Sequence, residues 1–130
     1  MLFAPEKRII LLSGIRFIVY QGKHVLLLDL SNCPAAEVEK IFRAVPEVVT
    51  ICPVGSVSIL SDFKGASIDQ EAIRVMKETA VFDKFYVKKS AWTGAENFPL
   101  VFSEKLGSFS CREFPVFETR AKALAWLTKD

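Results

Sequence analysis

The chain has 130 residues, of which 51% are apolar and 25% charged, and its formal net charge is +2. This size and apolar content are typical of one globular domain with its own core, and they argue against a disordered chain. The tightest basic cluster is only Lys84, Lys88 and Lys89, beside a predicted strand. Without a larger basic face, we expect no nucleic acid as a partner.

The cysteines and the N-terminal stretch indicate where the chain works. Cys33, Cys52 and Cys111 are widely spaced and form no CxxC pair, so neither a disulfide framework nor a metal site is indicated. We therefore expect three reduced thiols, no cofactor and a cytoplasmic location. The opening stretch looks briefly like a signal peptide, but Arg16 interrupts its apolar run. No run approaches the roughly 20 apolar residues that a transmembrane segment requires.

The first predicted elements are an antiparallel hairpin and a helix. The pattern predicts a strand over residues 15–20, a tight turn at 21–22 and a nearly all-apolar strand over 25–30. Apolar residues at helical spacing then predict a helix from residue 34 to about 51. Because Pro46 lies inside that pattern, we expect a kink there or a break into two short helices.

A strand and a well-marked helix follow. Residues 57–60 predict a third strand, which ends at Ser61 and Asp62. Asp69 can accept hydrogen bonds from the first free N–H groups of the next helix, so it is the expected N-cap. A fourth strand is expected from residue 85 to about 92.

The last third of the chain completes the alternation. A short helix is expected with Pro99 in its first turn and its end at Gly107, followed by a strand over 114–117 and a helix capped by Thr119. The alternation predicts the α/β class: an opening antiparallel hairpin, then βα units that form a mixed, mostly parallel sheet flanked by helices.

This order of elements, with the stretches "SDFKG", "DQEAIRVMKE", "YVKKSA" and "FETRAKALAWL", resembles the bacterial STAS-like, SpoIIAA-like proteins, many of them of unknown function. The resemblance implies one STAS-like domain over residues 1–130, acting without catalysis as a regulatory or protein-interaction module. Relatives include anti-sigma-factor antagonists, which are switched by phosphorylation of a serine at a strand-to-helix junction, and CRAL-TRIO lipid-binding domains.

The phosphorylation motif of those antagonists matches this chain only in part. Their motif is of the Asp-Ser-Ser-Gly type, whereas here Phe63 and Lys64 stand between Asp62 and Gly65. The nearest downstream hydroxyl belongs to Ser67. A phosphate on Ser67 would meet free N–H groups near a helix start, with Lys64 as a partner. Alternatively, Ser67 and Asp62 only form hydrogen bonds within the turn.

Two acids suggest a second use of the same edge. Asp29 and Asp62 both follow predicted strands, and if those strands are parallel neighbours, both carboxylates reach the edge where α/β proteins place ligands. We therefore add Asp29 to the candidate switch or ligand loop. An enzyme that uses the two acids is one alternative, but His24 is the single histidine and no partner spacing suggests a triad or a metal site. We expect no catalysis.

An apolar stretch suggests a binding surface. Trp92, Phe98, Val101, Phe102 and Phe109 surround a short helix that cannot easily bury apolar residues on every side. The helix could close an apolar pocket over a small lipid-like ligand, which would make the chain a carrier or sensor. It could instead present an apolar patch to another protein or to a second copy in a homodimer. Simple core packing is the third possibility.

Overall fold

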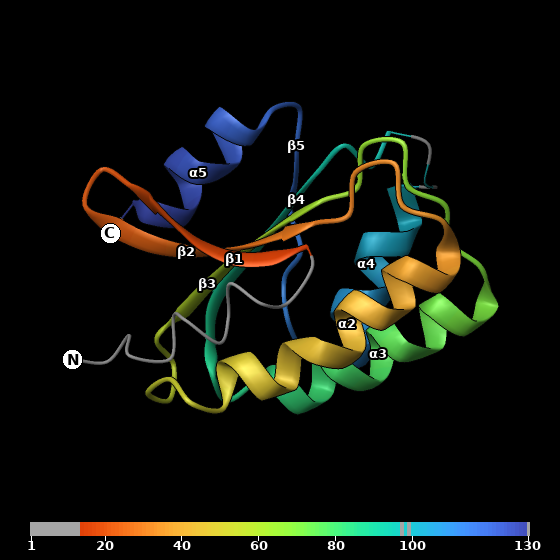
Figure 1. Cartoon of the computed structure of the whole chain (residues 1–130), viewed down its shortest axis with the longest axis horizontal. Coiled ribbons are helices and arrows are strands. Elements are labelled where there is room, and N and C mark those ends of the chain that lie inside the picture. Colours follow the sequence, from red (N-terminus) through yellow and green to blue (C-terminus); the bar gives the residue numbers. More distant parts are fainter. Residues whose placement is uncertain (1–13, 97, 99, 130) are drawn as a thin grey trace.

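A five-stranded sheet organises the chain in the computed structural model, which describes residues 14–96, 98 and 100–129. The strands lie in chain order: β1 (Ile15–Tyr20), β2 (Lys23–Asp29), β3 (Val57–Asp62), β4 (Val87–Thr93) and β5 (Val116–Phe117) (Figure 1). β1 and β2 pair antiparallel, and the other neighbours pair parallel. The predicted mixed, mostly parallel sheet with an opening hairpin is therefore confirmed.

Helices cover both faces of the sheet. They are α2 (Ala35–Val49), α3 (Gln70–Asp83), α4 (Leu100–Ser110) and α5 (Arg120–Thr128). Right-handed crossovers between neighbouring strands place the connecting helices on one face, and α2, α3 and α4 lie together on that side, while α5 covers the other (Figure 1). β2 shows the result, since Leu26 and Leu28 belong to the core under α2 to α4, and Val25 and Leu27 to the core under α5. Two covered faces explain the nearly all-apolar strand.

The expected break at Pro46 is wrong. α2 continues through Pro46 to Val49 as one helix. The Pro46 carbonyl accepts hydrogen bonds from both the Thr50 N–H (3.1 Å) and the Thr50 hydroxyl (2.8 Å). Val45, Val48 and Val49 are buried on either side of the proline. Their packing on the sheet offsets the hydrogen bond that proline cannot donate.

Gly107 does not end the fourth helix as expected. α4 continues to Ser110, and the residue with left-handed backbone after it is Cys111, with φ of 58°. Arg112 donates its N–H to the Gly107 carbonyl (3.0 Å), and a Cβ on Gly107 would lie 2.6 Å from the Arg112 carbonyl oxygen. Glycine is thus needed for close approach of the backbone. Phe109, which follows the expected helix end at Gly107, lies in α4, and Pro99 lies outside the described residues.

Two strands are shorter than predicted. β4 begins at Val87, so Phe85 and Tyr86 lie in the preceding loop, and β5 comprises only Val116–Phe117. The backbone carbonyl of Phe85 still accepts from the Gly55 N–H at 2.9 Å. The pairing of β3 with β4 shifts its register between Val57 and Ser58, so this hydrogen bond lies outside the regular pairing of the two strands. The α2–β3 and α3–β4 loops are consequently held side by side.

A hydrogen bond from Arg112, beside the buried acid Asp83, ties the end of α3 to the segment after α4. Asp83 is only 4% exposed, and among the described residues its Oδ1 has no hydrogen-bond partner. Arg112 donates to the Ala80 carbonyl (2.9 Å) and to the Ser90 hydroxyl (2.5 Å). Burial raises the pKa of Asp83 to about 7, and the attraction of Arg112 offsets only part of that rise. Both side chains line a cavity of about 30 Å³, enough for one water molecule.

Asp83 should make folding stability depend on pH. Because its folded pKa of about 7 lies above the ordinary 3.8, the folded state binds the extra proton between these values. The free energy of unfolding should therefore fall by about 2.5 kcal/mol between pH 5 and pH 8 from this residue alone. Asp83→Asn should remove that part of the decrease, which urea unfolding at the two pH values would measure. Equal pH dependence in both proteins would contradict the assignment.

Candidate functional site

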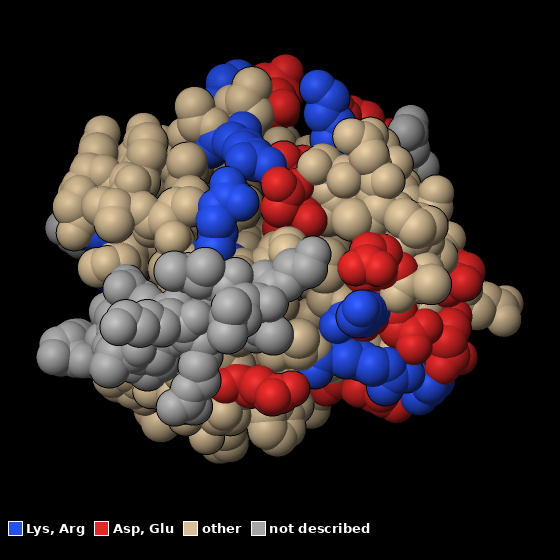
Figure 2. All heavy atoms as spheres, viewed as in Figure 1, with Lys and Arg blue, Asp and Glu red and all other residues tan. Residues whose placement is uncertain are grey.

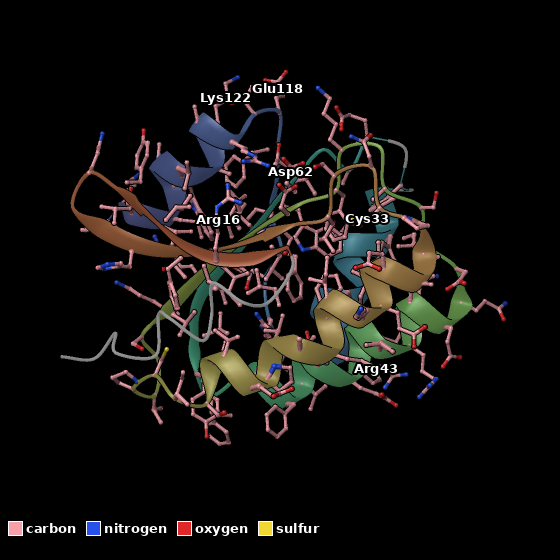
Figure 3. All side chains as sticks on the ribbon, viewed as in Figure 1. Arg16, Cys33, Arg43, Asp62, Glu118 and Lys122 are labelled. Carbon is pink, nitrogen blue, oxygen red and sulfur yellow. The ribbon has the colours of Figure 1, made fainter. Side chains whose placement is uncertain are left out.

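The two strand-end acids meet at the carboxyl edge of the sheet, as predicted. Asp29 and Asp62 are partners in the parallel register of β2 and β3. Arg120, the first residue of α5, joins them: its Nε lies 2.6 Å from Asp62 Oδ2 and its Nη2 lies 3.5 Å from Asp29 Oδ1. Figure 3 shows Asp62 beneath the start of α5. One guanidinium thus bridges both carboxylates.

The two acids differ in their surroundings. The Asp62 side chain is 9% exposed, and its other oxygen, Oδ1, accepts from the Lys64 N–H at 3.0 Å. The Asp29 side chain is 30% exposed and accepts from the Ser31 hydroxyl at 2.6 Å. Burial by itself would raise the pKa of Asp29, but the Ser31 hydrogen bonds, together with Arg120 and Arg16, lower it below its usual value. Asp29 is therefore held in the charged form that Arg120 requires.

Three loops interlock at this edge: residues 30–34, 63–69 and 94–96, here called the carboxyl-edge loops. Asn32 donates its N–H to the Lys64 carbonyl (2.7 Å). A Cβ on Gly65 would collide with the Asn32 side chain, and one on Gly94 would collide with the Lys64 backbone. Both glycines have a φ of +71°, which other residues rarely adopt. Glycine at these positions allows the loops to pack backbone against backbone.

The residues of the candidate switch or ligand loop lie in or beside the carboxyl-edge loops. Asp29, Asp62, Lys64, Gly65 and Ser67 all belong to the carboxyl edge. Lys64 and Ser67 are exposed. Ser67 donates its backbone N–H to the Cys33 carbonyl at 2.9 Å, two residues before Asp69, which caps α3 by accepting from the Ala72 N–H at 2.9 Å.

The predicted apolar residues do not gather at one surface. Trp92 is 2% exposed and packs between Phe63 (4.9 Å between ring centroids) and Phe102 (5.6 Å), with Phe98 against Phe63 at 5.1 Å. The cavity that Trp92 lines holds about 30 Å³, which is far below the size of a lipid. Phe109 points elsewhere: it is 58% exposed and lies under the Lys77 ammonium, 5.5 Å from its ring centroid. The side chain of Val101 lies outside the described residues.

Arg120 is the site residue that the sequence analysis missed. Thr119 caps α5, so Arg120 sits in the first turn, where the helix dipole disfavours a positive charge. A cation immediately after an N-cap was therefore a signal that carboxylates lie close by. That signal could not identify which acids they are, because Asp62 is 58 residues away in the chain.

Charge and metal-ligand patterns add little to this picture. Figure 2 shows positive side chains beside negative ones on the viewed face, rather than one patch of a single sign. Within the described residues, no group of three or more His, Cys, Asp or Glu could hold a metal ion, and no helix is long and apolar enough to cross a membrane. All three cysteines are free thiols, and burial raises the pKa of Cys33 and Cys52.

Removing the bridging guanidinium should destabilise the fold. Arg120→Met leaves Asp62 buried without its cation, and since Arg120 itself is 40% exposed we expect a loss of about 2 kcal/mol rather than the larger cost of a fully buried pair. Adding Asp62→Asn should restore part of the loss. Lys122→Met, which breaks the exposed Lys122–Glu118 pair nearby, is the control and should change little. Chemical denaturation measures all three; equal effects of Arg120→Met and Lys122→Met would contradict the bridging role.

Comparison with known proteins identifies the fold. The sequence matches no protein-family model and no curated protein. Its structure is similar to that of an uncharacterized protein of the DUF3478 family with a SpoIIAA-like fold from Shewanella loihica PV-4, with a TM-score of 0.69 and 16% identity over 87% of this chain and 91% of that one. At this identity the likeness establishes the fold and leaves the function open. The five-stranded sheet with its opening hairpin and flanking helices is thus a SpoIIAA-like fold.

Proposed function

We propose that this chain is a non-catalytic regulatory module that binds another protein through its carboxyl-edge loops. The observation that carries this proposal is the fixed position of an exposed serine. The backbone of Ser67 is held by its 2.9 Å hydrogen bond to Cys33, while its side chain is exposed. The surrounding loops are locked by close contacts at Gly65 and Gly94. A partner would meet a preformed surface and would lose little free energy in ordering it.

The local charges suit regulation by phosphorylation of Ser67. A phosphate would add a charge of about −2 to the exposed loop. Lys64, exposed in the same loop, could pair with it, whereas the Asp69 carboxylate already accepts an N–H group at the start of α3 and would repel it. The modification would thus change the charge that a partner meets without requiring a new fold. Phosphorylation of Ser67 would thus regulate the proposed protein binding, and a variant of Ser67 tests it separately from the binding itself.

The setting of the acid pair supports a role without catalysis. A general acid or base must reach a proton on the substrate. Asp62 is held on one oxygen by Arg120 and on the other by the Lys64 N–H, and its side chain is 9% exposed. These contacts favour a structural role for Asp29 and Asp62 over the enzymatic alternative.

Charge reversal at Lys64 should weaken partner binding. Lys64→Glu should reduce the amount of partner captured from cells of the source organism at least tenfold, and Ser67→Asp should change it by a similar factor. Lys105→Glu, on the exposed surface of α4, is the matched control and should leave capture unchanged. If every captured protein binds wild type and Lys64→Glu equally, the interaction proposal is overturned. Loss with Lys64→Glu but no effect of Ser67→Asp would remove only the switch.

A pocket at the other edge of the sheet favours a second candidate function, the carriage of a small ligand. It encloses about 390 Å³ and lies away from the aromatic residues predicted for this role. Phe17, Val57 and Leu127 contribute apolar walls, and Lys23 and Lys88 contribute cations. Such a lining suits a small apolar molecule that carries an acid group.

Native mass spectrometry of freshly purified protein would test the carrier function. A carrier should show an adduct of the mass of a small organic acid. Cys52→Trp, which fills part of the pocket, should abolish the adduct, and Cys111→Trp at an exposed cysteine should not. Wild-type protein without any adduct, purified from its own cells, would count against carriage.

A further inference from the structure

Exposed apolar side chains gather at the end of the molecule opposite the carboxyl-edge loops. α2 and α3 both end here, beside the loop that follows α2 (Figure 1). We call the following residues the apolar end, with their exposed fractions: Ile51 46%, Val54 71%, Val81 49%, Phe82 54% and Phe85 76%. Large exposed apolar groups in neighbouring segments commonly mark an interaction surface.

Backbone hydrogen bonds hold the two contributing loops together. Gly55 donates its N–H to the Phe85 carbonyl at 2.9 Å, and Val57 donates to the Tyr86 carbonyl at 3.0 Å. Val54 and Phe85 therefore come from loops that run side by side. Since they are 71% and 76% exposed, these two side chains project from the surface rather than line a recess.

Exposed charges of both signs lie beside the apolar end: Glu47 is exposed four residues before Ile51, and Glu78, four residues before Phe82, is paired with Arg74. Segments 50–56 and 81–89 contain four charged residues, and the single acid among them, Asp83, is 4% exposed. Lys84 and Lys88 are exposed. Lys89 is engaged within the fold, because its ammonium donates to the carbonyls of Trp126 and Lys129. Two exposed lysines thus flank the projecting apolar side chains.

We propose that the apolar end docks on the surface of a lipid bilayer that contains anionic lipids. Apolar and aromatic side chains insert at the boundary of headgroups and acyl chains, and lysines close to the surface are attracted by anionic headgroups. A second copy of this end would present the same exposed lysines, so it complements their positive charge less well than an anionic bilayer does. The proposal does not rest on the proposed function, but the two agree in geometry: docking by this end leaves the carboxyl-edge loops facing away from the membrane.

Vesicle co-sedimentation tests the proposal with the full chain. Wild type should bind vesicles of phosphatidylcholine with about 30% phosphatidylserine, at least tenfold more tightly than pure phosphatidylcholine vesicles, and high salt should weaken the binding. Phe85→Asp and Val54→Asp should each lower the affinity for anionic vesicles at least tenfold. The double variant Lys84→Glu, Lys88→Glu should remove the preference for anionic lipid.

Matched controls separate docking from general effects. Val116→Asp makes the same change as Val54→Asp at an exposed position of β5, and Lys105→Glu reverses a charge on α4; both should bind like wild type. Thermal unfolding would confirm that each variant is folded. Absence of wild-type binding to anionic vesicles, or equal binding of Phe85→Asp and Val116→Asp, would overturn the proposal. So would a dimer in sedimentation equilibrium that Phe85→Asp dissociates, or capture of a protein partner by this end without any vesicle binding.

Discussion

The bridge from Arg120 to Asp29 and Asp62 is the interaction on which the carboxyl edge depends. Parallel pairing of β2 and β3 brings two carboxylates to adjacent strand ends, where their like charges would repel each other. Arg120 sits between them and simultaneously fixes the start of α5 against the sheet. One side chain therefore joins the start of α5 to the ends of β2 and β3, at the point where the carboxyl-edge loops begin.

The second polar contact between distant segments is built differently. Asp83 is deeply buried and receives no hydrogen bond at Oδ1 from the described residues, whereas Arg112 is satisfied by Ala80 and Ser90. An ionised carboxyl in that position is costly, so its pKa rises to about 7. At the edge, Asp29 is held charged by its partners, whereas the interior acid Asp83 gains a proton near neutral pH. An Asp beside an Arg thus has a lowered pKa at the carboxyl edge and a raised pKa in the interior, because the solvent exposure and the hydrogen bonds of the two acids differ.

Parallel strands give the molecule two chemically distinct ends. At the carboxyl end, short loops with close backbone contacts hold Lys64 and Ser67 in place. At the amino end, the loops before β3 and β4 expose Val54 and Phe85. Because the connecting helices separate these ends, one end can bind a surface while the other remains accessible. The surface proposed to bind a protein and the surface proposed to dock on a membrane therefore do not overlap.

Local sequence signals determined the elements of this protein. The hairpin turn, the caps at Asp69 and Thr119 and the meeting of two strand-end acids were predictable, because each depends on neighbouring residues or on strand direction. The predicted helix end at Gly107 was wrong, because this glycine allows the backbone of Arg112 to approach closely and does not end the helix. The burial of Asp83, the partner of Arg120 and the packing of Trp92 became visible only in the tertiary structure. Each depends on contacts between segments far apart in the chain, and no local pattern specifies which of them meet.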